Sequence, residues 1–299
     1  MLVYDLAALA ASACFAMGAL FAMAPSRALG AVRFNRIRML MMSLLLAGVA
    51  ALTGGFASIA WSDFPILILS GLVGIFLGDT FLFAGLRRVG PRRNAIMFAL
   101  NAPLAAILGV LFLDEMLAPA VWLGCLTVTA GIIVAIAFGK RRSGDNPWDV
   151  VHGSLPAGLL FGFLAALGQA GGILLSRPVM ETGADPIAAS AVRVGVGCLA
   201  LLITYEIQQF RKPRDHRQWT AQYVIRTFGS GFIAMGVGMT CVMFALIGGK
   251  AGLVATLSSA APIVLLPMIW LTSRQAPALG AWIGASIVVL GTALIFSTR

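Results

Sequence analysis

The sequence predicts an all-α membrane protein, because apolar segments fill it and two similar halves divide it. Of its 299 residues, 60% are hydrophobic and only 11% are charged, and the mean hydropathy is +0.96. Soluble domains carry about 25% charged residues, so the chain lies far outside their range. The expected fold is a polytopic membrane protein of ten transmembrane helices, arranged in two inverted five-helix repeats around a central cavity.

Ten apolar segments are long enough to cross a bilayer when a window of about 19 residues is moved along the chain. They cover residues 3–24, 39–54, 65–86, 95–113, 118–138, 155–176, 187–208, 222–247, 251–272 and 278–297. The first segment ends in Ala22-Met23-Ala24, which resembles a signal-peptide cleavage site. The residues before it, MLVYD, contain an acid and no base, so we expect a retained helix.

One polar stretch divides the chain near its centre. The segment 139–154, GKRRSGDNPWDVVHGS, predicts a cytoplasmic linker. The first five-helix repeat is then expected at 1–138 and the second at 155–299.

Motifs recur between these halves at an offset of 160 residues. VWLGCLTVTAG begins at Val121 and AWIGASIVVLG at Ala281, while GDTFLFAGL begins at Gly78 and GMTCVMFAL at Gly238. Such self-similarity predicts an internal repeat. Because each copy has five spans, an odd number, the second copy must cross the membrane in the opposite orientation.

The polar residues argue against several function classes. The cysteines lie inside spans and show no CxxC spacing, so neither a disulfide framework nor a metal site is expected; they are Cys14, Cys125, Cys198 and Cys241. His152 and His216 lie in polar loops, so no histidine within a predicted span could act as the base or the metal ligand of a hydrolytic or zinc centre. The net charge of +10 is confined to loops and lacks an aromatic-rich polar surface, so nucleic acid is not an expected partner.

Inverted repeats are typical of secondary transporters, whose substrate site lies near the midplane and whose halves rock to alternate access. We therefore expect a transporter and not an enzyme, with no cofactor. Its expected partners are a small-molecule substrate and the lipid bilayer, and a monomer is expected. A membrane scaffold or an intramembrane enzyme is the alternative class.

Basic residues gather in alternate loops. The loops after spans 1, 3, 5, 7 and 9 contain Arg27, Arg33, Arg36, Arg38, Arg87, Arg88, Arg92, Arg93, Lys140, Arg141, Arg142, Arg211, Lys212, Arg214, Arg217 and Arg274. The opposite side has little beyond Arg177, Lys250 and Arg299. The positive-inside rule therefore predicts both termini outside the cytoplasm.

The segment FALNAPLAAILGVLFLDEMLAPAVWLGCLTVTAGIIV, which closes the first half, resembles the EamA branch of the drug/metabolite transporter superfamily. Its distinctive features are a central Pro103, the acidic link Asp114-Glu115 and a W-x-G-x6-G helix. Two of these recur in the second half, as Pro262 and as the helix that begins at Trp282, and Arg177 also fits the pattern. Phe15 and Arg274 depart from it, in place of a tryptophan and a second acidic link.

This resemblance implies a multi-pass transporter of small metabolites in the cell inner membrane. Because the branch includes exporters of aromatic and other amino acids, amino-acid export is the leading hypothesis. Export of cationic drugs and import of a nucleotide-sugar-like metabolite are the alternatives. The resemblance also implies that both termini lie inside the cell, which conflicts with the count of basic residues.

Polar and aromatic side chains inside the spans are the candidate substrate-binding residues. They are Asp79, Thr80, Phe83, Asn101, Gln169, Arg193, Thr240, Ser258 and Ser259. Asp79 and Phe83 share a helix face, and the counterpart of Asp79 in the second repeat is Met239. This asymmetry favours a substrate ammonium contact or a titrating group over a structural partner such as Arg193 or a backbone amide.

Other candidates carry alternatives of their own. Arg193 could bind a substrate carboxylate or extend toward the membrane surface, and Gln169 could line the cavity or join two helices. Pro103 and Pro262 predict paired helix breaks that act as hinges, or simple kinks that shape the bundle.

Overall fold

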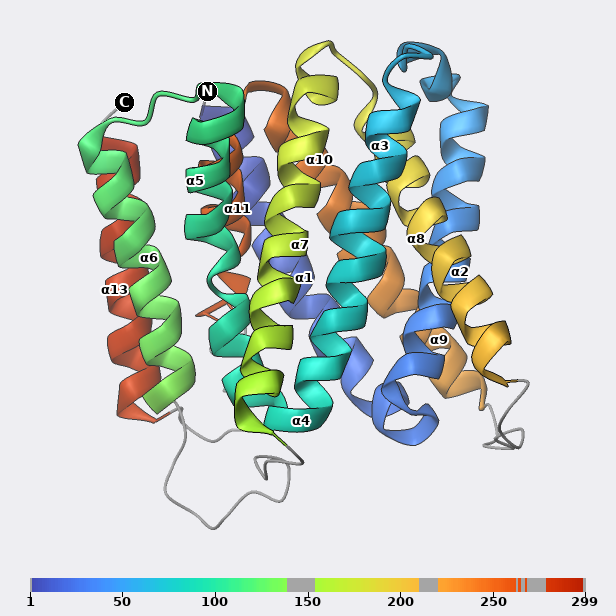
Figure 1. Cartoon of the computed structure of the whole chain (residues 1–299), viewed down its shortest axis with the longest axis horizontal. Coiled ribbons are helices and arrows are strands. Elements are labelled where there is room, and N and C mark those ends of the chain that lie inside the picture. The colour runs from blue at the N-terminus through green and yellow to red at the C-terminus, as the bar shows by residue number, and fades with distance from the viewer. Residues whose placement is uncertain are drawn as a thin grey trace.

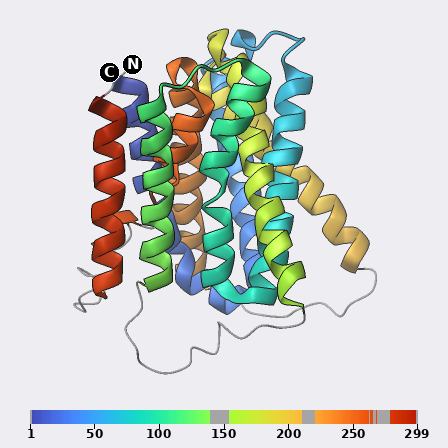
Figure 2. The same ribbon diagram turned by 60° about the vertical axis from the view of Figure 1, so that its left-hand side comes forward.

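The computed structural model describes residues 2–138, 154–209, 220–261, 263, 264, 267 and 278–297. This part of the chain is a bundle of helices and contains no strand (Figures 1 and 2). The first half comprises α1 (Leu2–Leu29), α2 (Ala31–Leu52), the 3-10 turn η1 (Gly55–Ser58), α3 (Phe64–Ser70), the π-helix η2 (Gly71–Leu77), α4 (Gly78–Phe98), α5 (Asn101–Leu113) and α6 (Pro119–Phe138). The second half comprises α7 (Leu155–Glu181), α8 (Pro186–Gln209), α9 (Ala221–Gly231), the π-helix η4 (Phe232–Gly238), α10 (Met239–Gly248), α11 (Ala251–Ser258) and α13 (Leu279–Ser297).

Eight segments of the described chain are long and apolar enough to cross a membrane. They are Leu2–Ala22, Arg33–Leu52, Phe64–Leu86, Arg93–Leu113, Pro119–Phe138, Leu155–Glu181, Pro186–Thr204 and Ala221–Gly248, with a shorter apolar helix at Leu279–Ile295. The expected span 251–272 is described only in part, so the count of ten remains a prediction. A multi-pass, all-helical membrane protein is what the structure shows.

Two loops expected from the sequence are helical instead. α1 continues through Pro25 to Leu29, and Gly30 alone, with φ of +82°, separates it from α2. Glycine adopts this left-handed backbone without steric cost, so a single residue turns the chain. α4 likewise runs unbroken through the Arg-rich segment 87–93.

The two ends of the bundle are distinct in Figure 1. One end, here called the termini face, carries the start of α1, the end of α13 and the link between α5 and α6. The opposite face holds the end of α6 and the start of α7. The first helix of each half therefore runs in opposite directions, α1 away from the termini face and α7 toward it.

The last helices of the two halves pack on each other through the repeated glycines. A Cβ built on Gly131 would lie 2.8 Å from the carbonyl oxygen of Gly284, and one on Gly124 would lie 3.0 Å from that of Gly291. Each contact maps onto the other when 160 is added to or subtracted from its residue numbers. Small residues let membrane helices approach this closely, so α6 and α13 form a self-complementary pair.

Serines join the third helix of each half to the first helix of the other. Ser70 Oγ donates to the Gly172 carbonyl of α7 at 2.6 Å, and Ser230 Oγ donates to the Gly18 carbonyl of α1 at 2.8 Å. The π-helix η2 begins directly after Ser70, and η4 begins two residues after Ser230. The two halves thus have a π-helix and a serine hydrogen bond to the other half at equivalent positions.

Candidate functional site

A helix in each half is broken at the same place. α4 and α5 are separated by Ala99 and Leu100, and α11 is followed by a turn at Ser259 and Ala260, 160 residues later. Proline causes such a break because it lacks an N–H and its ring presses on the carbonyl four residues earlier. For Pro103 that carbonyl belongs to Ala99, so the break lies upstream and Pro103 sits in the first turn of α5. The second hinge candidate, Pro262, lies outside the described residues.

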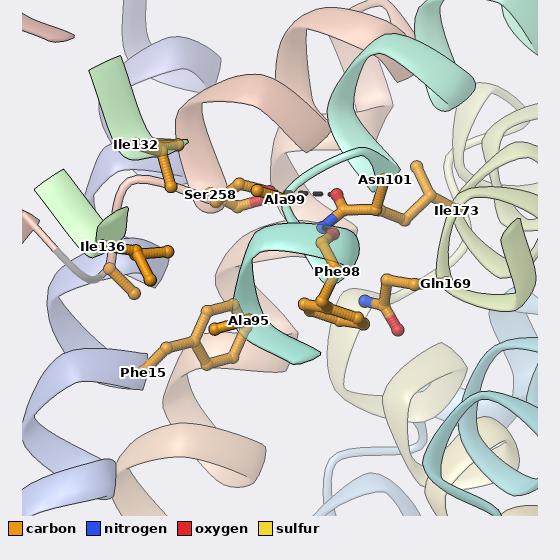
Figure 3. Close-up of a pocket in the computed structure, with 12 residues that line it drawn as sticks. Phe15, Ala95, Phe98, Ala99, Asn101, Ile132, Ile136, Gln169, Ile173 and Ser258 are labelled. Atoms are coloured by element: carbon orange, nitrogen blue, oxygen red, sulfur yellow. Dashed lines mark hydrogen bonds between the residues drawn. The ribbon is translucent and has the colours of Figure 1, made fainter. Parts of the chain in front are cut away.

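The two breaks meet and are joined by side chains (Figure 3). Ser259 Oγ donates to Asn101 Oδ1 at 2.9 Å, across the boundary between the halves. Asn101 Nδ2 in turn donates to the Phe98 carbonyl at 2.8 Å, which the break has left without its helical partner. The Phe98 carbonyl at one break and the Ser259 hydroxyl at the other are therefore both hydrogen-bonded to the Asn101 amide.

A cavity of about 260 Å³ lies at this junction. Its walls are formed by Phe15, Ala95, Phe98, Ala99, Asn101, Ile132, Ile136, Gln169, Ile173, Ser258, Ser259 and Ala261. The first half contributes Phe98, Ala99 and Asn101, and the second half contributes the residues 160 positions later. Pockets for small molecules combine apolar walls with a few placed polar groups. This cavity has that character, and none of the described lining residues is charged.

Four of the nine substrate-binding candidates line the cavity: Asn101, Gln169, Ser258 and Ser259. The other candidates lie elsewhere. Thr80 Oγ1 donates to the Phe76 carbonyl and Thr240 Oγ1 to the Gly236 carbonyl, both at 2.6 Å. These equivalent threonines bond carbonyls of the two π-helices. Phe83 is partly buried on α4 and is not part of the cavity wall.

Asp79 has partners in α2. Its Oδ2 accepts a hydrogen bond from Asn35 Nδ2 at 3.0 Å, and Asn35 Oδ1 accepts one from Arg38 Nη2 at 2.7 Å. In the described structure Asp79 therefore has a structural partner, and this partner is the Asn35 side chain and not Arg193. The sequence did not indicate this link because Asn35 and Arg38 were expected in a loop, whereas both belong to α2.

Arg193 is buried, with 1% of its surface exposed. Extension of its side chain to the membrane surface, one of the two interpretations of the sequence, is therefore wrong. Its Nη1 donates to Met243 Sδ at 3.3 Å and to Met239 Sδ at 3.5 Å.

A polar cluster at the termini face was not recognised as a site from the sequence. We call it the Glu115 cluster; it consists of Glu115, Arg177, Glu181, Lys250 and Ala251. The Glu115 carboxylate accepts the Ala251 N–H with both oxygens, at 2.8 and 3.1 Å, and so caps the first turn of α11. Its Oε1 lies 3.6 Å from Arg177 Nε, and Arg177 also pairs with Glu181 at 2.5 Å. Lys250 Nζ donates to the Met116 carbonyl.

The Glu115 carboxylate is 8% exposed and lies outside the membrane-spanning segments. Burial raises its pKa above the ordinary value, while the Ala251 N–H and the cations of Arg177 and Lys250 lower that pKa in part. The link therefore joins the first half to two helices of the second half through a carboxyl group that can titrate.

Below this cluster, α5 and α11 pack without a gap. A Cβ built on Gly252 would lie 2.4 Å from the Ala106 Cα, and one on Gly109 would lie 2.5 Å from Glu115 Oε2. α11 has eight residues and spans about 12 Å at 1.5 Å per residue. One end of this short helix is capped by Glu115, and the other end, Ser258, lines the cavity.

Comparison with known proteins supports this architecture. A model of the EamA-like transporter family matches residues 2–137 and again residues 156–297. One crystal structure, described only as that of a protein, is 20% identical, with a TM-score of 0.74 over 99% of this chain and 96% of the other. That similarity shows the fold alone, and no curated protein matches the chain. Because the family model covers both halves, the chain belongs to the EamA-like transporter family of the drug/metabolite transporter superfamily.

Proposed function

We propose that this chain is a secondary transporter that exports small amphiphilic metabolites, with amino acids as the first candidates, across the bacterial inner membrane. Family membership supports small-molecule transport across a membrane. The observation that carries the finer proposal is the uncharged cavity at the junction of the two broken helices. Its amide and hydroxyl groups can hydrogen-bond a zwitterionic end group, while Phe15 and Phe98 offer apolar surface to a side chain.

The same lining argues against the alternatives. A nucleotide-sugar-like anion would require bases, and a cationic drug would be favoured by a carboxylate. Neither type of side chain occurs among the described residues of the cavity wall. At about 260 Å³ the cavity is also slightly smaller than the usual range for ligand pockets, which favours small substrates.

Alternating access would work through the junction itself. A ligand shifts an equilibrium only through contacts that differ between the two states. The Asn101–Ser259 bond joins the two halves, so it breaks if they separate and re-forms if they close. A substrate that replaces this bond in one state would bias the exchange. Asp79 acts in this proposal through its hydrogen bond to Asn35 of α2 rather than by contact with the substrate.

The test is uptake into proteoliposomes of the purified full chain, with a panel of labelled amino acids and polyamines and with or without a pH gradient. Asn101→Ala and Gln169→Ala should each lower transport of the preferred substrate about tenfold, the cost of about 1.4 kcal/mol from a lost hydrogen bond. Thr127→Val is the matched control, because among the described residues the Thr127 hydroxyl bonds only the Leu123 carbonyl of its own helix, at 2.7 Å.

The same panel separates the alternatives. Inhibition by quaternary cations, with no flux of amino acids, would replace amino-acid export with drug export. A chain that moves none of these compounds in either direction would contradict the proposal, as would wild-type flux in both cavity variants.

A further inference from the structure

Arg193 is a cation deep inside the bundle. It lies about 10 Å along α8 from Pro186 and is the largest of the fully buried side chains in the described chain. Its side chain reaches between helices of both halves, where Nη2 lies 3.3 and 3.2 Å from the Cβ positions of Gly74 and Gly172. The first of these glycines belongs to η2 and the second to α7.

No counter-charge accompanies this arginine in the described part of the chain. Its only hydrogen bonds there go to the sulfurs of Met239 and Met243, and thioether sulfur is a weak acceptor. Its Nε has no hydrogen-bond partner there. The carboxylate of Asp79 bonds Asn35, and that of Glu115 pairs with Arg177.

An arginine cannot resolve this situation by losing its proton, because it stays charged in proteins. An isolated buried charge costs several kcal/mol unless an opposite charge and hydrogen bonds accompany it. The two methionines that cover the guanidinium are unbranched and flexible, so their side chains can move aside. Two glycines flank the other edge of the group and add no side chain.

We propose that Arg193 anchors a buried binding site for a small monovalent anion, either a carboxylate or an inorganic anion such as chloride. The planar guanidinium presents paired N–H donors that match a carboxylate, and a single chloride can also accept from two of them. Only a small anion suits a site bounded by Gly74, Gly172 and two methionines. The carboxylate arm alone rests on the proposed function, since there the ligand would be the acidic end of a substrate that extends beyond the cavity wall at Gln169, three residues before Gly172 on α7.

The experiment measures binding and does not require transport. The full chain in detergent is dialysed into sodium gluconate, whose anion is too bulky for the site. Gluconate is then replaced stepwise by acetate or chloride at constant ionic strength, and the thermal midpoint is followed by tryptophan fluorescence. A ligand that binds the native state raises that midpoint with a saturable dependence on its concentration.

We expect a saturable rise for the wild-type chain and none for Arg193→Gln or Arg193→Met. Methionine is included because an apolar replacement of a buried charge often leaves a protein equally or more stable. Arg193→Lys keeps the charge without the planar fork and should raise the half-maximal concentration about tenfold. Arg226→Gln removes a charge from a partly exposed position of α9 and should respond as wild type.

A response to acetate alone would identify a carboxylate site, and a response to both anions would identify a general anion site. In the first case, free amino acids should stabilise the chain and their methyl esters should not. The absence of a saturable response in the wild-type chain would overturn the inference. An unchanged response in Arg193→Gln or Arg193→Met would overturn it as well. Transport of esters and acids alike would contradict the carboxylate arm while leaving the proposed transport function intact.

Discussion

Replacement of Glu115 tests whether the Glu115 cluster keeps the termini face closed. Glu115→Ala removes both acceptors of the Ala251 N–H and one of the two carboxylate partners of Arg177, whereas Glu115→Gln retains one acceptor. The two variants therefore separate the hydrogen bond from the charge.

The magnitude follows from these contacts. A hydrogen bond to a charged group contributes about 1.5 to 3 kcal/mol. Arg177 keeps Glu181 at 2.5 Å, so the alanine variant leaves no buried cation without a partner. We expect Glu115→Ala to weaken closure by about 2 kcal/mol, which is a ~30-fold change in the ratio of open to closed forms. Glu115→Gln should change it by about 1 kcal/mol or less, since it keeps a capping oxygen.

The assay is the rate at which an impermeant maleimide modifies a cysteine placed at Ala261 in the cavity wall. The background lacks the four native cysteines, and membrane vesicles of both orientations are used so that each face is tested separately. Labelling from the termini face should be ~30-fold faster in Glu115→Ala than in the parent chain. Equal rates in the parent chain and the alanine variant would refute a closing role for this residue.

The pH dependence has a definite sign. Because burial raises the pKa of Glu115, the closed form binds a proton more tightly than a form in which water reaches the carboxyl group. Closure is therefore favoured below the ordinary pKa of a glutamate, and this contribution is lost as the pH rises through the raised value. The rate of labelling from the termini face, divided by the rate for a free thiol in solution at the same pH, should fall on acidification in the parent chain and stay constant in Glu115→Gln.

Two further substitutions test the packing and the intramembrane carboxylate. Gly252→Val places a side chain 2.4 Å from the Ala106 Cα, so it should separate α5 from α11, lower the thermal midpoint through a cost of about 1 to 3 kcal/mol and speed labelling from the termini face. Gly48→Val is its control, because a Cβ there meets nothing within 4 Å, and equal effects of the two variants would contradict the packing argument. Asp79→Asn should lower transport about tenfold by weakening the bond from Asn35, and Asn35→Ala should have a similar effect. Wild-type rates with unchanged pH dependence in Asp79→Asn would remove any role for this carboxylate.

The features predictable from the sequence are those that depend on local patterns. Hydropathy locates membrane helices, and an internal repeat appears as matching letters at a fixed offset. A proline predicts a helix break within the four residues before it. Pro103 and Pro262 therefore indicated Asn101, Ser258 and Ser259 as polar residues close to such breaks. Asn101, Ser258 and Ser259 were reached in this way, whereas Gln169 was a candidate because it is an amide within an apolar span; all four line the cavity.

The features that could not be predicted depend on which helices meet. Glu115 and Ala251 are 136 residues apart, and nothing local to either residue indicates that one caps the helix of the other. The partner of Asp79 was hidden because an arginine-rich segment reads as a loop, although its arginines and Asn35 lie on a helix. The burial of Arg193 could not be predicted for the same reason, because it depends on neighbours from three other elements, η2, α7 and α10.

The glycine contacts between α6 and α13 determine which part of the molecule can move. Their backbones approach so closely that a methyl group on Gly131 or Gly284 would clash with the backbone of the other helix. Neither helix can rotate or slide against the other without a backbone clash, so α6 and α13 form a rigid unit. We therefore expect the conformational changes of transport to occur in the other helices, while α6 and α13 keep their mutual packing.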